Sequence, residues 1–259
     1  MKPEEKIARI KALKGMGRIA AVTAYDYPTA QLVGEAGLDL LLVGDSLGVV
    51  VLGYENPLSV TMDEMLHHTR AVARGTDVPL IIGDMPVNTY RLPEEALGNA
   101  RLFLEAGAEG VKVEGPRLEV VEALTREGIP TLGHIGLTPQ TIQDYRVQGR
   151  DAGSAERLLG EAKGLEKAGA FAIVLECVPE DLGRRITKGI GIPTIGIGAG
   201  RYTDGQILVV SDLLGLFDRY VPKFARQYLN LRREIRQALE DYRRDVEGGR
   251  FPGEENVYR

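Results

Sequence analysis

The sequence is poor in cysteine, contains no tryptophan and has no long hydrophobic run. Cys177 is the single cysteine, which excludes an internal disulfide and is typical of a reducing compartment such as the cytoplasm. No apolar run approaches the roughly 20 residues that span a bilayer, and the amino terminus lacks the apolar core of a signal peptide. We therefore expect a cytoplasmic protein that neither enters nor crosses a membrane.

An excess of basic residues is also missing. The chain has 32 Lys and Arg against 37 Asp and Glu, which gives a net charge of −5. Proteins that bind nucleic acid carry a basic stripe, so no nucleic-acid partner is expected. The chain has 259 residues, 44% of them hydrophobic, and an α/β barrel typically has about 250 residues. We expect residues 1–259 to form a single domain with a carboxyl-terminal helical and tail segment.

Eight short apolar runs alternate with stretches of helical periodicity. The runs are residues 19–22, 40–43, 80–82, 110–113, 130–132, 172–175, 194–197 and 207–210. Such alternation is typical of βα units around a parallel sheet. Eight units predict a (β/α)8 barrel, and a doubly wound open sheet is the alternative.

The segments between these runs have apolar residues at helical spacing, as in 93–106, 118–127 and 155–168. Many of them end on a glycine, the residue that most often follows the last turn of a helix. These glycines are Gly37, Gly75, Gly107, Gly128 and Gly169. Residues 222–247 are expected to form one or two charged, amphipathic helices packed outside the barrel.

Acidic residues follow four of the eight predicted strands. They are Asp45, Asp84, Glu114 and Glu176. The carboxyl ends of barrel strands meet at one rim, where the active site lies. A single acid at such a place is commonly a helix cap, but four would repel one another unless a cation neutralised them. This pattern favours Mg²⁺ or another hard divalent ion. Zinc is not expected, because the spacing of cysteine and histidine does not suit it.

Two basic side chains belong to the same rim. Lys112 lies two residues before Glu114, on the same face of its strand. It could pair with a carboxylate, bind the carboxylate of a substrate or form a Schiff base, and the surrounding acids favour substrate binding. His134 follows the fifth predicted strand, where it could donate a hydrogen bond to a substrate. The glycine-rich residues 196–200 lack the context of a dinucleotide fingerprint, so NAD is not expected.

Several sequence strings occur together in the order and spacing of one known family. They are residues 23–26, 42–48, 111–115, 133–140, 175–179, 195–200, 203–209 and 252–255. On these strings the chain resembles the ketopantoate hydroxymethyltransferase family nearly from end to end. The resemblance implies a (β/α)8 barrel of the phosphoenolpyruvate-mutase/isocitrate-lyase type, assembled as a homodecamer.

The resemblance also implies a reaction. Members of the family transfer a hydroxymethyl group from 5,10-methylenetetrahydrofolate to 3-methyl-2-oxobutanoate through a metal-stabilised enolate. The product is 2-dehydropantoate, and the step is the first committed one toward pantothenate and coenzyme A. One Mg²⁺ per subunit would be bound by Asp45, Asp84 and Glu114.

Further roles follow from the same resemblance. Glu176 matches the general base that removes a proton from the substrate. Ser46 and Lys112 match positions that hold the keto acid, together with the metal ligands Asp45 and Asp84. His134 matches a polar residue that lines the same pocket.

The chain departs from the family pattern at two places. Residues 140–147 form a shorter loop than usual, and Ser211 stands where many members have histidine, which leaves loop closure and the folate contacts open. Three alternatives also remain. They are a related metal-dependent lyase or aldolase without folate, a Schiff-base aldolase that uses Lys112, and a ligand-binding barrel without activity.

Overall fold

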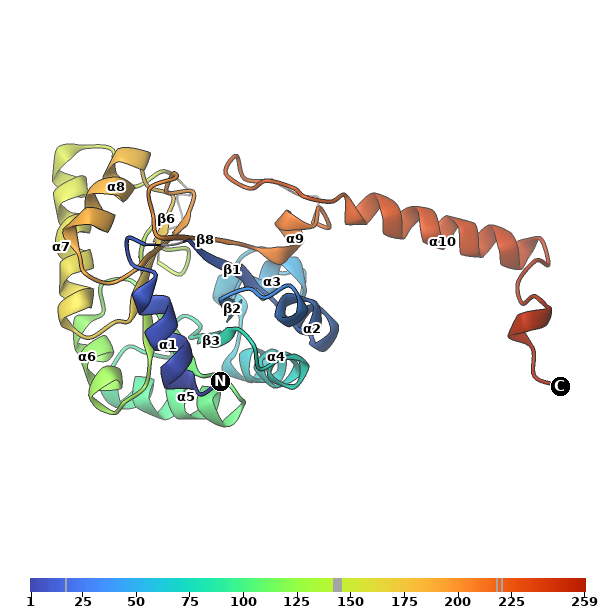
Figure 1. Cartoon of the computed structure of the whole chain (residues 1–259), viewed down its shortest axis with the longest axis horizontal. Helices are drawn as coiled ribbons and strands as arrows, with labels where there is room; N and C mark the ends of the chain where they lie inside the picture. Colours follow the sequence, from blue (N-terminus) through green and yellow to red (C-terminus); the bar gives the residue numbers. More distant parts are fainter. Residues whose placement is uncertain (17, 142–145, 218, 220) are drawn as a thin grey trace. The chain divides into compact units, whose positions relative to one another are not determined.

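The computed structural model describes residues 1–259 except 17, 142–145, 218 and 220. The chain divides into two compact units, Met1–Val209 and Val210–Arg259. The first unit contains a closed barrel of parallel strands in the order β1 to β8, in which β8 pairs with β1 (Figure 1). The predicted barrel is confirmed, and its closure excludes the open sheet.

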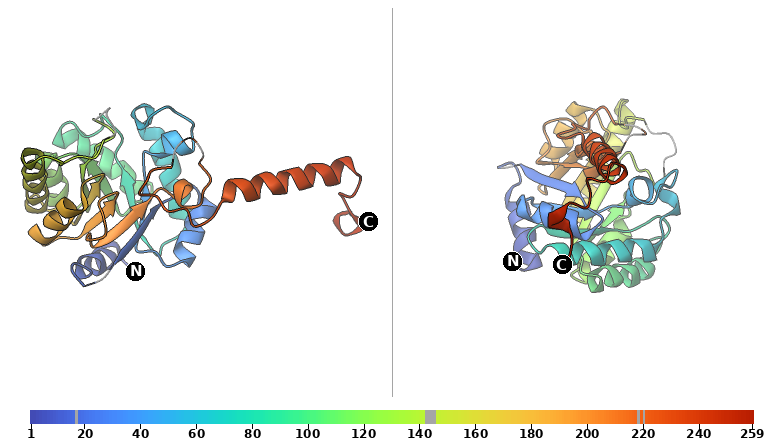
Figure 2. Two further views of the ribbon diagram at one scale, coloured as in Figure 1. Left: turned by 90° about the horizontal axis from the view of Figure 1, so that it is seen from above. Right: turned by 90° about the vertical axis from the view of Figure 1, so that its right-hand side faces the viewer.

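Helices connect the strands and surround them, as the right-hand view in Figure 2 shows. The strands are β1 (Ile19–Thr23), β2 (Leu40–Val43), β3 (Leu80–Asp84), β4 (Gly110–Glu114), β5 (Thr131–Gly136), β6 (Ala172–Glu176), β7 (Thr194–Ile197) and β8 (Gly205–Leu208). The helices of this unit are α1 (Pro3–Ala12), α2 (Tyr27–Glu35), α3 (Leu47–Val50), η1 (Pro57–Ser59), α4 (Met62–Gly75), α5 (Pro93–Glu105), α6 (Leu118–Arg126), α7 (Ala152–Lys167) and α8 (Glu180–Gly189).

Polar side chains set the starts of several helices. Asp26 accepts a hydrogen bond from the backbone N–H of Thr29 at the start of α2, and Thr61 forms a capping box with Glu64 at the start of α4. Such caps satisfy backbone N–H groups that have no partner within the helix. The starts of these helices are therefore determined by residues that are close in the sequence.

β2 and β7 have the predicted bounds, whereas β1, β3, β4 and β6 extend one or two residues further at their carboxyl ends, and β5 and β8 differ at both ends. β5 continues to Gly136, so His134 lies within the strand and not after it. β8 begins at Gly205, two residues before the predicted run, and Val210 already belongs to α9 (Val210–Leu213). A Cβ at Gly205 would lie 2.6 Å from the backbone oxygen of Ile19. The close approach of β1 requires glycine there, although glycine is a poor strand former.

The prediction that Gly75 follows its helix is wrong. Gly75 is the last residue of α4, and the next residue, Thr76, is extended. A Cβ at Gly75 would lie 2.6 Å from the backbone oxygen of Tyr27 and 2.8 Å from the Cβ of Ala30. The glycine thus permits α4 to pack closely on α2, which is a tertiary requirement and not a cap.

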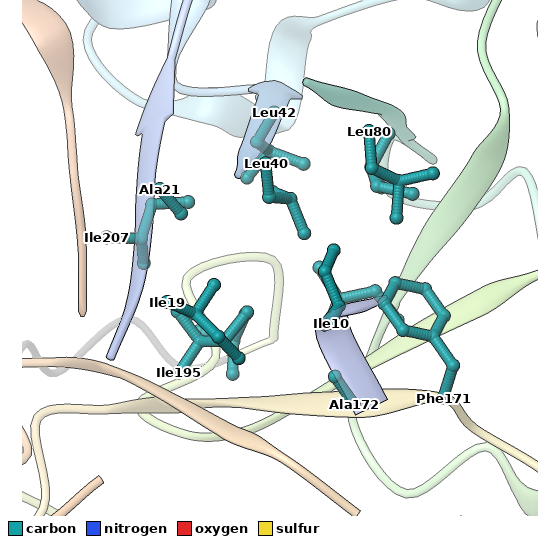
Figure 3. Packing of buried hydrophobic residues seen from close by; sticks show 13 residues of the cluster. Ile10, Ile19, Ala21, Leu40, Leu42, Leu80, Phe171, Ala172, Ile195 and Ile207 are labelled. Carbon is teal, nitrogen blue, oxygen red and sulfur yellow. The ribbon is translucent and has the colours of Figure 1, made fainter. Parts of the chain in front are cut away.

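Alternate residues of the strands fill the barrel interior (Figure 3). The cluster consists of Ile10, Ile19, Ala21, Leu40, Leu42, Leu80, Ile82, Leu132, Phe171, Ala172, Val174, Ile195 and Ile207. Ile10 comes from α1 and is 1% exposed. Because side chains alternate along a strand, Asp84 shares a face with Leu80 and Ile82, and Glu176 shares one with Ala172 and Val174. The apolar interior therefore leads directly into a charged layer.

The segment containing α1 is joined to the barrel by ion pairs. Nζ of Lys6 lies 2.8 Å from Oε1 of Glu109, just before β4, and also donates to the backbone oxygen of Pro79. Nζ of Lys14 lies 2.9 Å from Oδ2 of Asp204, just before β8. These contacts hold the amino-terminal segment against the amino ends of the strands.

The second unit contains α9, α10 (Leu231–Glu247) and η2 (Glu254–Asn256). The predicted terminal helix is confirmed from Leu231 onward, whereas residues 222–230 form turns and irregular structure. Asn230 caps α10 by accepting a hydrogen bond from the backbone N–H of Arg233, which sets the start of the helix. Packing of this helix outside the barrel stays a prediction. Across the described part of the chain, no helix combines the length and apolar character needed to cross a bilayer.

Candidate active site

The predicted site residues gather at the carboxyl ends of strands β2 to β6. Asp84, Glu114 and Glu176 are the last residues of β3, β4 and β6, and Asp45 lies two residues after the end of β2. Asp45, Asp84 and Glu114 are buried at 9%, 1% and 3% exposure. Three carboxylates withdrawn from water at one end of a barrel form an unusual concentration of negative charge.

Lys112 is the cation closest to this charge. It is the register partner of Asp84, and its Nζ lies 2.7 and 2.8 Å from the two oxygens of Asp84. Burial alone would lower the pKa of Lys112, but Asp84, Asp45 and Glu114 raise it. The amine is therefore held protonated, which argues against the Schiff-base alternative because that chemistry needs a neutral amine. The ion pair considered from the sequence is present.

Burial raises the pKa of Asp84 to about 6, against the opposing effect of Lys112. The pKa of Asp45 is also raised, mainly by burial, with a further contribution from Glu114. The backbone N–H of Asp45 donates to Oδ2 of Asp84 at 3.2 Å, so the two acids are adjacent. A cation placed between them would relieve the cost of burying two negative charges.

His134 lies between two carboxylates. Its Nδ1 is 3.3 Å from Oε2 of Glu114, and its Nε2 is 3.1 Å from Oε2 of Glu176. Both distances are in ion-pair range, although neither contact has the alignment of a hydrogen bond. Burial and the charge of Lys112 lower the pKa of His134, but Glu114 and Glu176 together raise it to about 9. The two carboxylates therefore favour the protonated form of the ring.

Ser46 takes part in a short chain of hydroxyl groups. Its Oγ lies 2.9 Å from the hydroxyl of Tyr25, which accepts a hydrogen bond from Thr23 at 2.7 Å. Tyr25 is buried and Ser46 is half-buried. Ser46, the predicted substrate-binding serine, directly follows Asp45 in the sequence, and its contact with the hydroxyl of Tyr25 sets its orientation.

Two site residues were given no role from the sequence. Gln140 donates to Oδ2 of Asp45 at 2.8 Å, and the hydroxyl of Tyr90 donates to the side-chain oxygen of Gln140. Gln140 follows β5 closely in the sequence, which could have suggested a place at the rim. No pattern around Tyr90 signals its position. The shortened loop predicted over 140–147 includes residues 142–145, which lie outside the described residues.

The family model described as ketopantoate hydroxymethyltransferase matches residues 4–254. The chain belongs to the ketopantoate hydroxymethyltransferase family. The assignment made from the sequence strings is thus confirmed. The chain is similar to a 3-methyl-2-oxobutanoate hydroxymethyltransferase of Moorella thermoacetica, at 49% identity over 98% of this chain and 97% of the relative. It is similar to the enzyme of that name from Oleidesulfovibrio alaskensis, at 51% identity over 97% and 89%.

Solved structures with the same fold are more distant in sequence. A 2,3-dimethylmalate lyase of the PEP mutase/isocitrate lyase superfamily aligns with a TM-score of 0.67 at 15% identity, over 95% of this chain and 86% of that chain. A phosphonopyruvate hydrolase aligns with a TM-score of 0.65 at 14% identity, over 100% and 92%. At these identities the likeness shows the fold alone, and it agrees with the predicted (β/α)8 barrel.

In this member of the ketopantoate hydroxymethyltransferase family, the side chains at the site offer oxygen ligands that suit a hard divalent cation. Asp45, Asp84 and Glu114 offer carboxylate oxygens, and Lys112 supplies one positive charge against their three. In the described residues, no three His, Cys, Asp or Glu side chains form a cluster arranged to hold a metal ion. Mg²⁺ is commonly held by only one or two carboxylates, with water and substrate oxygens completing the shell. The adjacent pair Asp45 and Asp84 satisfies that requirement, and Glu114 as a third ligand stays a prediction.

Proposed function

We propose that the chain transfers a hydroxymethyl group from 5,10-methylenetetrahydrofolate to 3-methyl-2-oxobutanoate, giving 2-dehydropantoate in the biosynthesis of pantothenate. The observation that carries the proposal is the arrangement of Asp45 and Asp84 around Lys112, with the fourth carboxylate, Glu176, at the same end of the barrel. The names of relatives at about half identity support the same reaction.

Asp45 and Asp84 are the residues that would hold Mg²⁺, with Glu114 beside them. When bound, Mg²⁺ would supply a Lewis acid that polarises the 2-oxo group and increases the acidity of carbon 3. The carboxylates are already positioned on strand ends, so little conformational entropy remains to be lost on binding.

Lys112 and Ser46 would hold the substrate carboxylate. An ammonium group has three N–H donors, so Lys112 can bind Asp84 and a substrate oxygen at the same time. The hydroxyl of Ser46, oriented by Tyr25, would donate to the same carboxylate. Fixing the carboxylate places carbon 3 at a constant distance from the base, which favours reaction through proximity.

Glu176 would act as the general base. Its side chain is 18% exposed, whereas that of His134 is 3% exposed, so Glu176 can meet a ligand that enters the barrel mouth. Nε2 of His134 lies 3.1 Å from Oε2 of Glu176, and His134 would line the same pocket. The Glu176 carboxylate would accept the proton from carbon 3. This proton transfer needs no redox cofactor.

The folate co-substrate completes the reaction. Carbon 3 attacks the methylene carbon and forms a carbon–carbon bond as the bond from that carbon to one folate nitrogen breaks, and the bond to the second folate nitrogen breaks when water attacks. The proton from carbon 3 and one proton of the water end on the two nitrogens. Water supplies the hydroxyl oxygen, and tetrahydrofolate leaves. A lyase that runs a retro-aldol cleavage would pass through the same enolate but would need no folate, so dependence of product formation on the folate distinguishes the two.

The first test is exchange of the carbon-3 proton of 3-methyl-2-oxobutanoate in D₂O, followed by NMR without folate. We expect exchange with Mg²⁺, loss of exchange with EDTA, and a decrease of at least about 100-fold for Glu176→Gln. Glu156→Gln, which changes an exposed glutamate of α7, is the matched control and should retain exchange. Exchange that persists in EDTA or in Glu176→Gln would contradict the proposal.

The proposal extends to a homodecamer in the cytoplasm, which the family resemblance supports. Light scattering after size-exclusion chromatography measures the number of subunits. Small molecules are the expected ligands, namely the 2-oxo acid and the folate, and the net charge of −5 argues against a nucleic-acid partner.

A further inference from the structure

Gln140 is a buried polar residue with an unusual set of partners. It is 5% exposed and lies four residues after the end of β5. Its backbone N–H donates to Oε1 of Glu114 at 2.8 Å, and its side-chain Nε2 donates to Oδ2 of Asp45 at 2.8 Å. One residue therefore binds two carboxylates that come from β4 and from the end of β2.

The orientation of the Gln140 amide is determined by two further contacts. Nε2 also donates to the backbone oxygen of Met85 at 3.0 Å, and a backbone oxygen can only accept. On the opposite side of the amide, the hydroxyl of Tyr90 donates to Oε1 of Gln140. Turning the amide over would place oxygen against oxygen at Met85 and at Asp45. The N–H group is consequently held toward Asp45.

A neutral amide differs from a cation as a partner for a carboxylate. Lys112 binds both oxygens of Asp84 and neutralises its charge. Gln140 binds one oxygen of Asp45 and adds no charge, so this contact does not neutralise Asp45. A donor on one oxygen also fixes the direction in which the other oxygen points.

We propose that Gln140 is a positioning residue that orients Asp45 and Glu114 for a divalent cation, and that Tyr90 holds the Gln140 amide in the required orientation. The inference rests on the proposed function, because it needs a cation to bind at Asp45. Partners of this kind, which orient metal-binding side chains, are worth about 10–100-fold in metal affinity in other proteins.

The test measures the Kd of Mn²⁺ for the full chain, stripped with EDTA and dialysed, by titration with detection of free Mn²⁺. Gln140→Met keeps the length of the side chain and the backbone contact to Glu114 but removes the donor to Asp45. We expect its Kd to rise about 10–100-fold. Tyr90→Phe removes only a hydroxyl and should raise the Kd by a smaller factor.

The double variant tests the mechanism. If Tyr90 acts through Gln140, adding Tyr90→Phe to Gln140→Met should change the Kd of Mn²⁺ little further, so that the two effects are not additive. Gln237→Met is the matched control, because Gln237 donates in the same way to an exposed aspartate, Asp241, in the second unit. Its Kd should equal that of the original chain.

A loss of folding is separated from a loss of positioning by circular dichroism and by thermal unfolding in EDTA. The Kd refers to the folded protein, so a lower melting temperature alone does not change it. A Kd for Gln140→Met within twofold of the original chain would overturn the inference and leave the proposed function intact. If the original chain binds no Mn²⁺, with or without the 2-oxo acid, both the inference and the proposed metal site are overturned.

Discussion

Lys112 and Asp84 face each other across β4 and β3, and Nζ of Lys112 contacts both oxygens of the Asp84 carboxylate at 2.7 and 2.8 Å. Both side chains are almost fully buried. The pair removes one negative charge from the acidic end of the barrel and places an ammonium group next to the proposed metal ligands. If Lys112 binds the substrate carboxylate as proposed, stability and substrate binding depend on the same pair of residues.

Lys112→Met should destabilise the protein strongly in the presence of EDTA. The substitution leaves Asp84 buried without its partner, which costs about 3–5 kcal/mol in comparable cases. Urea unfolding followed by circular dichroism measures the free energy of unfolding. Lys163→Met, an exposed lysine of α7, serves as control and should lie within about 0.5 kcal/mol of the original chain. A loss below about 1 kcal/mol for Lys112→Met would contradict the importance of the pair.

Two ion pairs made by residues of α1 should differ in their contribution to the stability of the protein. The Lys6 side chain is 4% exposed and pairs with Glu109, whereas that of Arg9 is 52% exposed and pairs with Asp39. Lys6→Ala should therefore lower the free energy of unfolding by about 3 kcal/mol or more. Arg9→Ala should lower it by no more than about 1 kcal/mol. Equal losses in the same urea experiment would show that burial does not decide the difference.

The reactivity of Cys177 should depend steeply on pH. Burial, with a contribution from Glu176, raises the pKa of its thiol to about 11. Because the thiolate is the reactive form, a raised pKa leaves little of it near neutrality, and the fraction increases about tenfold for each pH unit up to that value. At pH 8, alkylation by iodoacetamide should be about two orders of magnitude slower than for a small thiol with a pKa of about 8.5. Mass spectrometry of the single cysteine gives the rate, and a rate equal to that of glutathione would refute the expectation.

Tyr25→Phe should weaken binding of the 2-oxo acid. The change removes the hydroxyl next to Oγ of Ser46 and so releases the orientation of the serine. Loss of one such hydrogen bond is worth about 1 kcal/mol, which predicts a KM for the keto acid about fivefold higher with a smaller change in kcat. Tyr27→Phe alters an exposed tyrosine of α2 and is the control. An unchanged KM in Tyr25→Phe would exclude this role for Tyr25.

Most of the barrel and of its acidic end could be predicted from local patterns. Asp84, Glu114 and Glu176 each close an apolar run, and the alternation of side chains along a strand places them inside the barrel. The limits of β8 could not be predicted in this way. Gly205 begins the strand because β1 approaches it closely, a contact between residues far apart in the sequence. The role of Gly75 was misjudged for the same reason, since its neighbours belong to another helix.

The sequence by itself determined the eight strands and their alternation with helices, the family, and the end of the barrel that carries the acids. These features depend on residue periodicity and on short motifs, which act over one strand or one helical turn. Only the tertiary structure decided which groups meet: that Lys112 pairs with Asp84, that His134 lies between Glu114 and Glu176, and that Gln140 reaches Asp45 across 95 residues. Those contacts follow from the register of adjacent strands and the closure of the barrel, which the packing of the whole chain sets.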